Sequence, residues 1–168
     1  MPIDRSTPPP ASSTAVPRML LVALAHPLRH DDGVAASVLS LVSPRAGVER
    51  RVMVQPPPDM ATELRRYDEV VFVDTDTLAD EAVVEPLEMR PTPGVAIGHS
   101  LRPGEVVTLA RYAHGFTGRA WMCRVPVRAL ESGVAADAES EVQVRAAAAA
   151  LHEAFPVSLG FAGSTAAS

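Results

Sequence analysis

Met19-Leu-Leu-Val-Ala-Leu-Ala25 is an unbroken apolar run, and His26-Pro-Leu-Arg-His-Asp-Asp-Gly33 follows it directly. A short apolar run bounded by turn residues is typical of a strand that is buried on both faces. Gly33 to Val42 then holds small and aliphatic residues at a helical period and stops at Ser43-Pro44, because proline breaks a helix. Together these segments predict a strand, a turn and a helix, the repeating unit of an α/β sheet.

The same alternation continues along the chain to residue 155. Further strands are predicted at 48–54, 69–74 and 120–125, with a weaker strand candidate at 83–89. Further helices are predicted at 60–66, 103–113 and 138–155. Gly115 is a favoured helix-stop residue and marks the end of the second of these helices. This alternation predicts a single-domain, three-layer α/β fold with helices on both faces of a mostly parallel, twisted sheet.

Length and composition exclude several classes of protein. A chain of 168 residues that is 47% hydrophobic can bury one core and is too short for two ordinary domains. A formal net charge of -5 with scattered arginines argues against a nucleic-acid partner. Because no apolar stretch reaches membrane-spanning length, no membrane partner is expected. With one cysteine and no signal pattern at its start, the chain is expected in the cytoplasm.

The two ends of the chain differ in composition from its middle. Residues 1–17 are rich in proline and serine and hold few large apolar groups, so a disordered tail is predicted there. Residues 156–168 look similar and are predicted to be a flexible tail, although Leu159 and Phe161 could dock locally. The folded domain is therefore expected to span residues 18–155.

Candidate chemistry lies where the predicted strands end. Ligands of parallel sheets bind beyond the carboxyl ends of the strands. Asp32 follows the first strand, Asp74 ends a later one and His99 follows a third element, so these side chains are expected to converge. Two carboxylates and an imidazole suit a divalent transition metal such as nickel or zinc. Without a thiolate, such a site would hold a free ion modestly and would more readily engage a metal that another molecule carries.

Four stretches of this sequence carry a resemblance to a known family. They are Pro27-Leu-Arg-His-Asp-Asp-Gly-Val34, Tyr67-Asp-Glu-Val-Val-Phe-Val-Asp74, Gly98-His-Ser-Leu101 and Glu131-Ser-Gly-Val134. In this order, across roughly residues 19 to 155, the chain resembles the hydrogenase maturation endopeptidases, which trim the C-terminus of the nickel-iron hydrogenase large subunit. The first stretch is fairly specific, and the others count only in combination.

The resemblance implies a function and a set of site residues. It implies an endopeptidase that recognises nickel already inserted in the large-subunit precursor and then releases a short C-terminal peptide. Asp32 and Asp74 would contact the nickel through carboxylates and His99 through its imidazole, and these three would also be the catalytic residues. Nickel arrives with the substrate, no organic cofactor is implied, and the enzyme is expected to be a monomer. We hypothesise that the metal or Asp74 activates a water for direct attack on the peptide bond.

Departures from the family pattern leave a second function open. Ala25-His26 stands where the family has Gly-Asn, and Arg124-Val-Pro-Val127 stands where it has Gly-Ile-Glu-Gly. Arg102 replaces the Ser or Thr expected to cap the following helix, which should cost about 1 kcal/mol. The alternative function is a catalytically inactive relative that binds a hydrogenase or another metalloprotein as an assembly factor. A nucleotide-binding domain is a weaker alternative, because no glycine-rich phosphate loop follows any predicted strand.

Each candidate residue also has a purely structural interpretation. Asp31 and Asp32 would stabilise the start of a helix by their charge, without any ligand. Asp74 could be a turn-former at a strand end, and a lone loop histidine such as His99 is more often structural than a ligand. Cys123 falls within a predicted buried strand, where a free cysteine is usually inert, so a cysteine nucleophile has no support.

Overall fold

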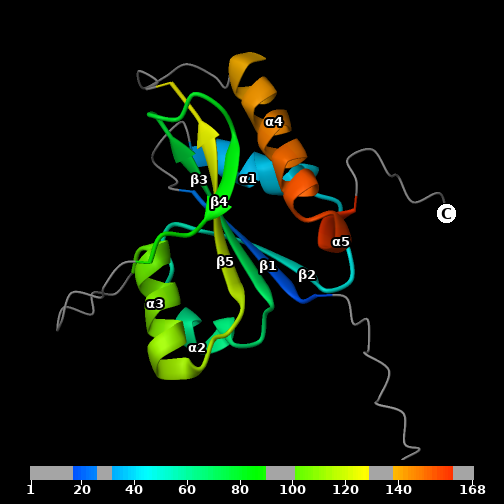
Figure 1. Cartoon of the computed structure of the whole chain (residues 1–168). Coiled ribbons are helices and arrows are strands. Elements are labelled where there is room, and N and C mark those ends of the chain that lie inside the picture. Colours follow the sequence, from blue (N-terminus) through cyan, green and yellow to red (C-terminus); the bar gives the residue numbers. More distant parts are fainter. Residues whose placement is uncertain (1–16, 26–31, 90–100, 129–137, 161–168) are drawn as a thin grey trace, which may run out of the picture.

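The structure is a computed structural model that describes residues 17–25, 32–89, 101–128 and 138–160 (Figure 1). Within these ranges one sheet has the strand order β2-β1-β3-β5-β4. Its strands are β1 (Met19–Leu24), β2 (Val48–Met53), β3 (Glu69–Asp76), β4 (Val83–Pro86) and β5 (Arg119–Pro126). The helices are α1 (Asp32–Leu41), α2 (Met60–Leu64), α3 (Pro103–His114), α4 (Ala138–Ala154) and α5 (Pro156–Leu159).

The sheet is parallel except at one edge. β1 pairs with β2 and β3, and β3 with β5, all in parallel, whereas β4 is antiparallel to β5. The predicted three-layer α/β class with a mostly parallel sheet is therefore confirmed. None of the helices in the described ranges is long and apolar enough to cross a membrane.

The first strand is buried on both faces because helices cover both sides of the sheet. Met19, Leu21 and Ala23 pack into one apolar cluster with α1 and α4, and the residues between them pack into a second cluster with α2 and α3. Figure 1 shows these two helix pairs on opposite sides of the sheet. This explains why the run that opens the fold has no polar alternation.

The direction of each crossover decides which face a helix covers. The chain leaves β1 for β2 by way of α1 and then returns past β1 to β3 by way of α2. From β3 it forms β4 at the far edge and then reaches β5 by way of α3. Crossovers between parallel strands are almost always right-handed, so steps in opposite directions must use opposite faces of the sheet. The strand order reverses between β1 and β3, and in open α/β sheets ligands bind in the crevice at this point.

Several elements end at residues other than those expected from the sequence: β4 stops at Pro86 and α2 at Leu64, two or three residues early, and other ends move by a residue. β3 continues to Asp76, two residues beyond the strand that was expected to stop at Asp74. After Phe155, where a flexible tail was expected, the chain forms α5 and buries Leu159 in the core beside α4. The Nδ1 atom of His152 lies 2.9 Å from the carbonyl oxygen of Gly160, which holds α5 against α4. The folded part thus extends past residue 155.

Helix α3, which borders the candidate site, is defined at both ends. Gly115 has φ 70°, a left-handed conformation that suits glycine, and it ends the helix as predicted. At the start, Arg102 provides no capping acceptor, but the carboxylate of Glu105 accepts a hydrogen bond from the Arg102 N–H at 2.7 Å. This bond is one half of a capping box and offsets part of the expected cost of the missing cap.

Candidate active site

A cleft of about 650 Å³ opens at the carboxyl edge of the sheet, on the face that α3 covers. Leu24 at the end of β1 and Asp74 near the end of β3 both line it, so it lies at the point where the strand order reverses. The segments after β2 and the start of α3 complete its walls. Its apolar lining residues are Leu24, Val54, Leu78, Leu87, Leu101 and Met122. The rest of its lining is largely polar and charged, so it is a cleft in which charged groups meet apolar walls.

Asp74 lies in the cleft, as its position in the sequence predicted. Strand residues alternate between faces, and Phe72 belongs to the apolar cluster on the α3 side, so Asp74 also points to that side. Its Oδ1 atom accepts a hydrogen bond from the N–H of Thr75 at 2.9 Å. The side chain is partly exposed. A carboxylate oriented in this way can bind a metal ion or accept a proton from water.

The other two predicted site residues are Asp32 and His99. Asp32 is the first residue of α1, so its backbone follows β1 closely along the chain. His99 lies outside the described residues. The convergence of Asp32, Asp74 and His99 on one metal ion therefore stays a prediction. Among the described residues, no group of three or more histidine, cysteine, aspartate or glutamate side chains is arranged to hold a metal.

The structure adds charged residues to the site that sequence reasoning did not assign. Asp76, Glu88 and Arg102 line the cleft together with Asp74. The alternation of Asp74 and Asp76 in one strand was the available signal, because residues two apart share a face. It was missed because the predicted strand ended at Asp74.

Arg124 also lines the cleft and pairs with two carboxylates. Its Nη1 atom lies 3.2 Å from Oδ2 of Asp76, and its Nε atom donates to the carboxylate of Glu85 on β4. The hydrogen bond to Glu85 raises the pKa of the Arg124 guanidinium above its ordinary value, so this group stays cationic. The cleft thus holds the guanidinium of Arg124 at a fixed position among carboxylates.

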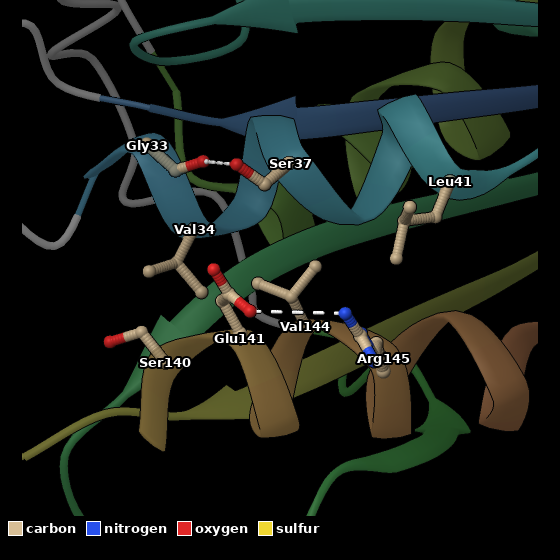
Figure 2. Close-up of a pocket in the computed structure, with 8 residues that line it drawn as sticks. All are labelled: Gly33, Val34, Ser37, Leu41, Ser140, Glu141, Val144 and Arg145. Carbon is tan, nitrogen blue, oxygen red and sulfur yellow. Dashed lines mark hydrogen bonds and ion pairs between the residues drawn. The ribbon is translucent and has the colours of Figure 1, made fainter. Parts of the chain in front are cut away.

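A second, smaller groove of about 300 Å³ runs between α1 and α4. Figure 2 shows Val34 and Leu41 of α1 facing Val144 of α4 across it. Ser37 donates to the carbonyl of Gly33 within α1, and the carboxylate of Glu141 pairs with Arg145 within α4 at 3.8 Å. Because these polar groups pair within their own helices, the groove is a weaker candidate for chemistry than the cleft beside Asp74.

Comparison with solved structures identifies the architecture. The hydrogenase maturating endopeptidase HybD from E. coli superposes with a TM-score of 0.63 at 14% identity, over 82% of this chain and 91% of that one. The chain has the fold of the hydrogenase maturation endopeptidases. A hydrogenase 2 maturation peptidase from a Thaumarchaeota archaeon gives a TM-score of 0.57 at 22% identity, over 83% of this chain and 99% of that one.

A third structure of the same fold is the [NiFe] hydrogenase maturation protease HycI from Thermococcus kodakarensis. Its TM-score is 0.52 at 18% identity, over 80% of this chain and 90% of that chain. No family model and no curated protein sequence matches this chain. The three superpositions together establish the maturation-endopeptidase fold for this chain.

The thiol of Cys123 is expected to be unreactive in the folded protein. The residue is completely buried in β5, and burial raises the pKa of its thiol to about 12. Since the thiolate is the reactive form, labelling by a thiol reagent at pH 7 to 9 should be negligible for the native chain. In guanidinium chloride one thiol per chain should react, because Cys123 is the single cysteine. Rapid labelling of the native protein would contradict the inert role given to this residue.

Proposed function

We propose that this chain is an endopeptidase that removes the C-terminal peptide from a nickel-iron hydrogenase large-subunit precursor after nickel insertion. The proposal rests chiefly on Asp74, because a residue that the family resemblance assigns to metal contact lies in a cleft at the reversal of the strand order. The shared fold supports the same function. The enzyme would act as a monomer in the cytoplasm.

The proposed chemistry uses the metal that the substrate brings. Asp32, Asp74 and His99 would contact the nickel of the precursor and thereby place the scissile peptide bond in the cleft. A metal ion polarises a carbonyl group or lowers the pKa of a bound water, and a nearby carboxylate can accept the proton of that water. Asp74 is suited to this task because its Oδ1 atom is oriented by the Thr75 N–H while its side chain remains partly exposed.

Intact-mass analysis of a precursor provides the test of this function. Untagged chain is incubated with a nickel-loaded large-subunit precursor and, in parallel, with the same precursor without nickel. The expected result is loss of the C-terminal peptide from the nickel-loaded form alone. His99→Ala should abolish this loss, because the variant removes the imidazole contact to the metal. Equal trimming by the variant and the unmodified chain would defeat the role assigned to His99.

The second candidate function is a non-catalytic assembly factor with the same fold. The observation that favours it is Arg124, a cation fixed on the strand beside Asp74, at a site proposed to meet a metal ion. In this case the chain would form a stable complex with the precursor, and the mass of the precursor would not change. If the precursor is not trimmed and no complex forms, both candidate functions are excluded.

A further inference from the structure

Arg124 lies directly across from Asp74 in the sheet. The two residues are Cα partners in the ladder between β3 and β5. Both line the cleft, so both side chains extend from the same face of the sheet. Neighbouring strands are about 5 Å apart, and side chains of paired residues on one face are therefore close. Any cation that approaches Asp74 also approaches Arg124.

Two carboxylates hold the Arg124 side chain in place. Asp76 contacts Nη1, and Glu85 accepts a hydrogen bond from Nε, so the guanidinium is fixed by strands on both sides of β5. Asp76 is itself held, because its Oδ1 atom accepts the N–H of Leu78 at 2.8 Å. The side chains of Asp76 and Arg124 are 22% and 41% exposed, so the group is open enough for solvent ions to reach it.

This arrangement changes how the cleft treats metal ions. Carboxylate oxygens are ligands for divalent cations, and Asp74, Asp76 and Glu85 would together attract such ions. The guanidinium occupies oxygen atoms of Asp76 and Glu85 and adds a positive charge beside Asp74, and both effects oppose the binding of a free cation. A metal that is already coordinated by a substrate needs fewer ligands from the cleft. The guanidinium of Arg124 therefore opposes its binding less than the binding of a free cation.

We propose that Arg124 is a specificity-determining residue that keeps free divalent cations from binding at Asp74, so that the cleft engages a metal only when a substrate carries it. The biological role rests on the proposed function, whereas the effect on metal affinity does not. Discrimination of this kind comes from a repulsive group rather than from an added attractive one.

Calorimetric titration of the untagged chain with nickel chloride at pH 7 tests this inference. Arg124→Gln should bind nickel at least about tenfold more tightly than the unmodified chain, because the variant removes the charge and releases Asp76 and Glu85. Arg124→Lys keeps the charge and should stay within about threefold of the unmodified chain. Arg124→Gln combined with Asp74→Asn should lose the gain, which assigns the binding to the cleft.

Arg66→Gln is the matched control, because Arg66 also pairs with a carboxylate, that of Glu63 at 3.2 Å, but does not line the cleft. Its nickel affinity should equal that of the unmodified chain. If circular dichroism shows that Arg124→Gln is unfolded, Arg124→Thr carries the same expectation, since threonine suits a strand. Nickel affinity unchanged by the Arg124 substitution, or a gain that survives Asp74→Asn, would overturn the inference.

The outcome can be separated from that of the proposed function because the titration contains no precursor. If the affinities change as expected but no precursor is trimmed, the proposed function fails and the effect of Arg124 on metal binding stands. If the precursor is trimmed but the substitution leaves nickel affinity unchanged, the function stands and the role of Arg124 fails.

Discussion

Asp74→Asn is expected to slow trimming of a nickel-loaded precursor by at least about 100-fold, the range typical of a lost general base. Asparagine has nearly the same shape, and its side-chain oxygen can still accept the hydrogen bond from the Thr75 N–H that orients Asp74. The amide lacks the negative charge, so it binds a metal weakly and cannot take a proton from water. The rate is measured by intact mass over time, at a precursor concentration above that needed for saturation.

Asp59→Asn supplies the control for this substitution. Asp59 is exposed at the start of α2, and its side chain makes no capping hydrogen bond, so the variant loses one negative charge without losing a structural contact. Trimming by Asp59→Asn should match that of the unmodified chain. If Asp74→Asn trims at a comparable rate while its thermal unfolding is unchanged, Asp74 is not part of the reaction.

Phe72→Ala is expected to have the largest effect on stability. Phe72 lies in the middle of β3 between Val22 and Met122 on the neighbouring strands, and it is completely buried. Replacing a buried phenylalanine by alanine costs about 3 to 5 kcal/mol, because apolar contacts are lost and a cavity remains. For a chain of 168 residues this corresponds to a fall in melting temperature of roughly 10 °C. Thermal and urea unfolding followed by circular dichroism measure both quantities.

Leu78→Ala tests whether burial, rather than loss of an apolar side chain, causes that effect. Leu78 follows β3 and is 90% exposed. Its substitution should change the free energy of unfolding by less than about 0.5 kcal/mol. A similar loss of stability in both variants would mean that the burial of Phe72 is not the cause of the effect.

Most of the architecture could be predicted from local sequence patterns. The run from Met19 to Ala25 has no polar residue, which indicates a strand covered on both faces, and the helices at 103–113 and 138–155 agree with α3 and α4 to within a residue or two. Such patterns report how each segment meets the core. They contain no information on where β3 stops, because Asp74-Thr75-Asp76 is polar in either a strand or a turn.

The candidate site was predictable only in part. The place of Asp74 near the carboxyl edge of the sheet could be predicted because it directly follows an apolar run, and the carboxyl ends of parallel strands share one edge of the sheet. Arg124 was noted as a departure from a family pattern, but the sequence offered no reason to connect it with Asp76 or Glu85. These partners are 48 and 39 residues away along the chain, so they are brought together by the pairing of β3, β5 and β4.

The sequence by itself determined the layered α/β class, the buried first strand and the place of Asp74 near the carboxyl end of a strand, because periodicity and apolar runs reflect local burial. The tertiary structure alone decided the antiparallel addition of β4 to β5 and, with it, the fixation of Arg124 between two carboxylates next to Asp74. The physical reason is that the charge around Asp74 depends on contacts between strands that are distant in sequence, and no local pattern encodes which strands become neighbours.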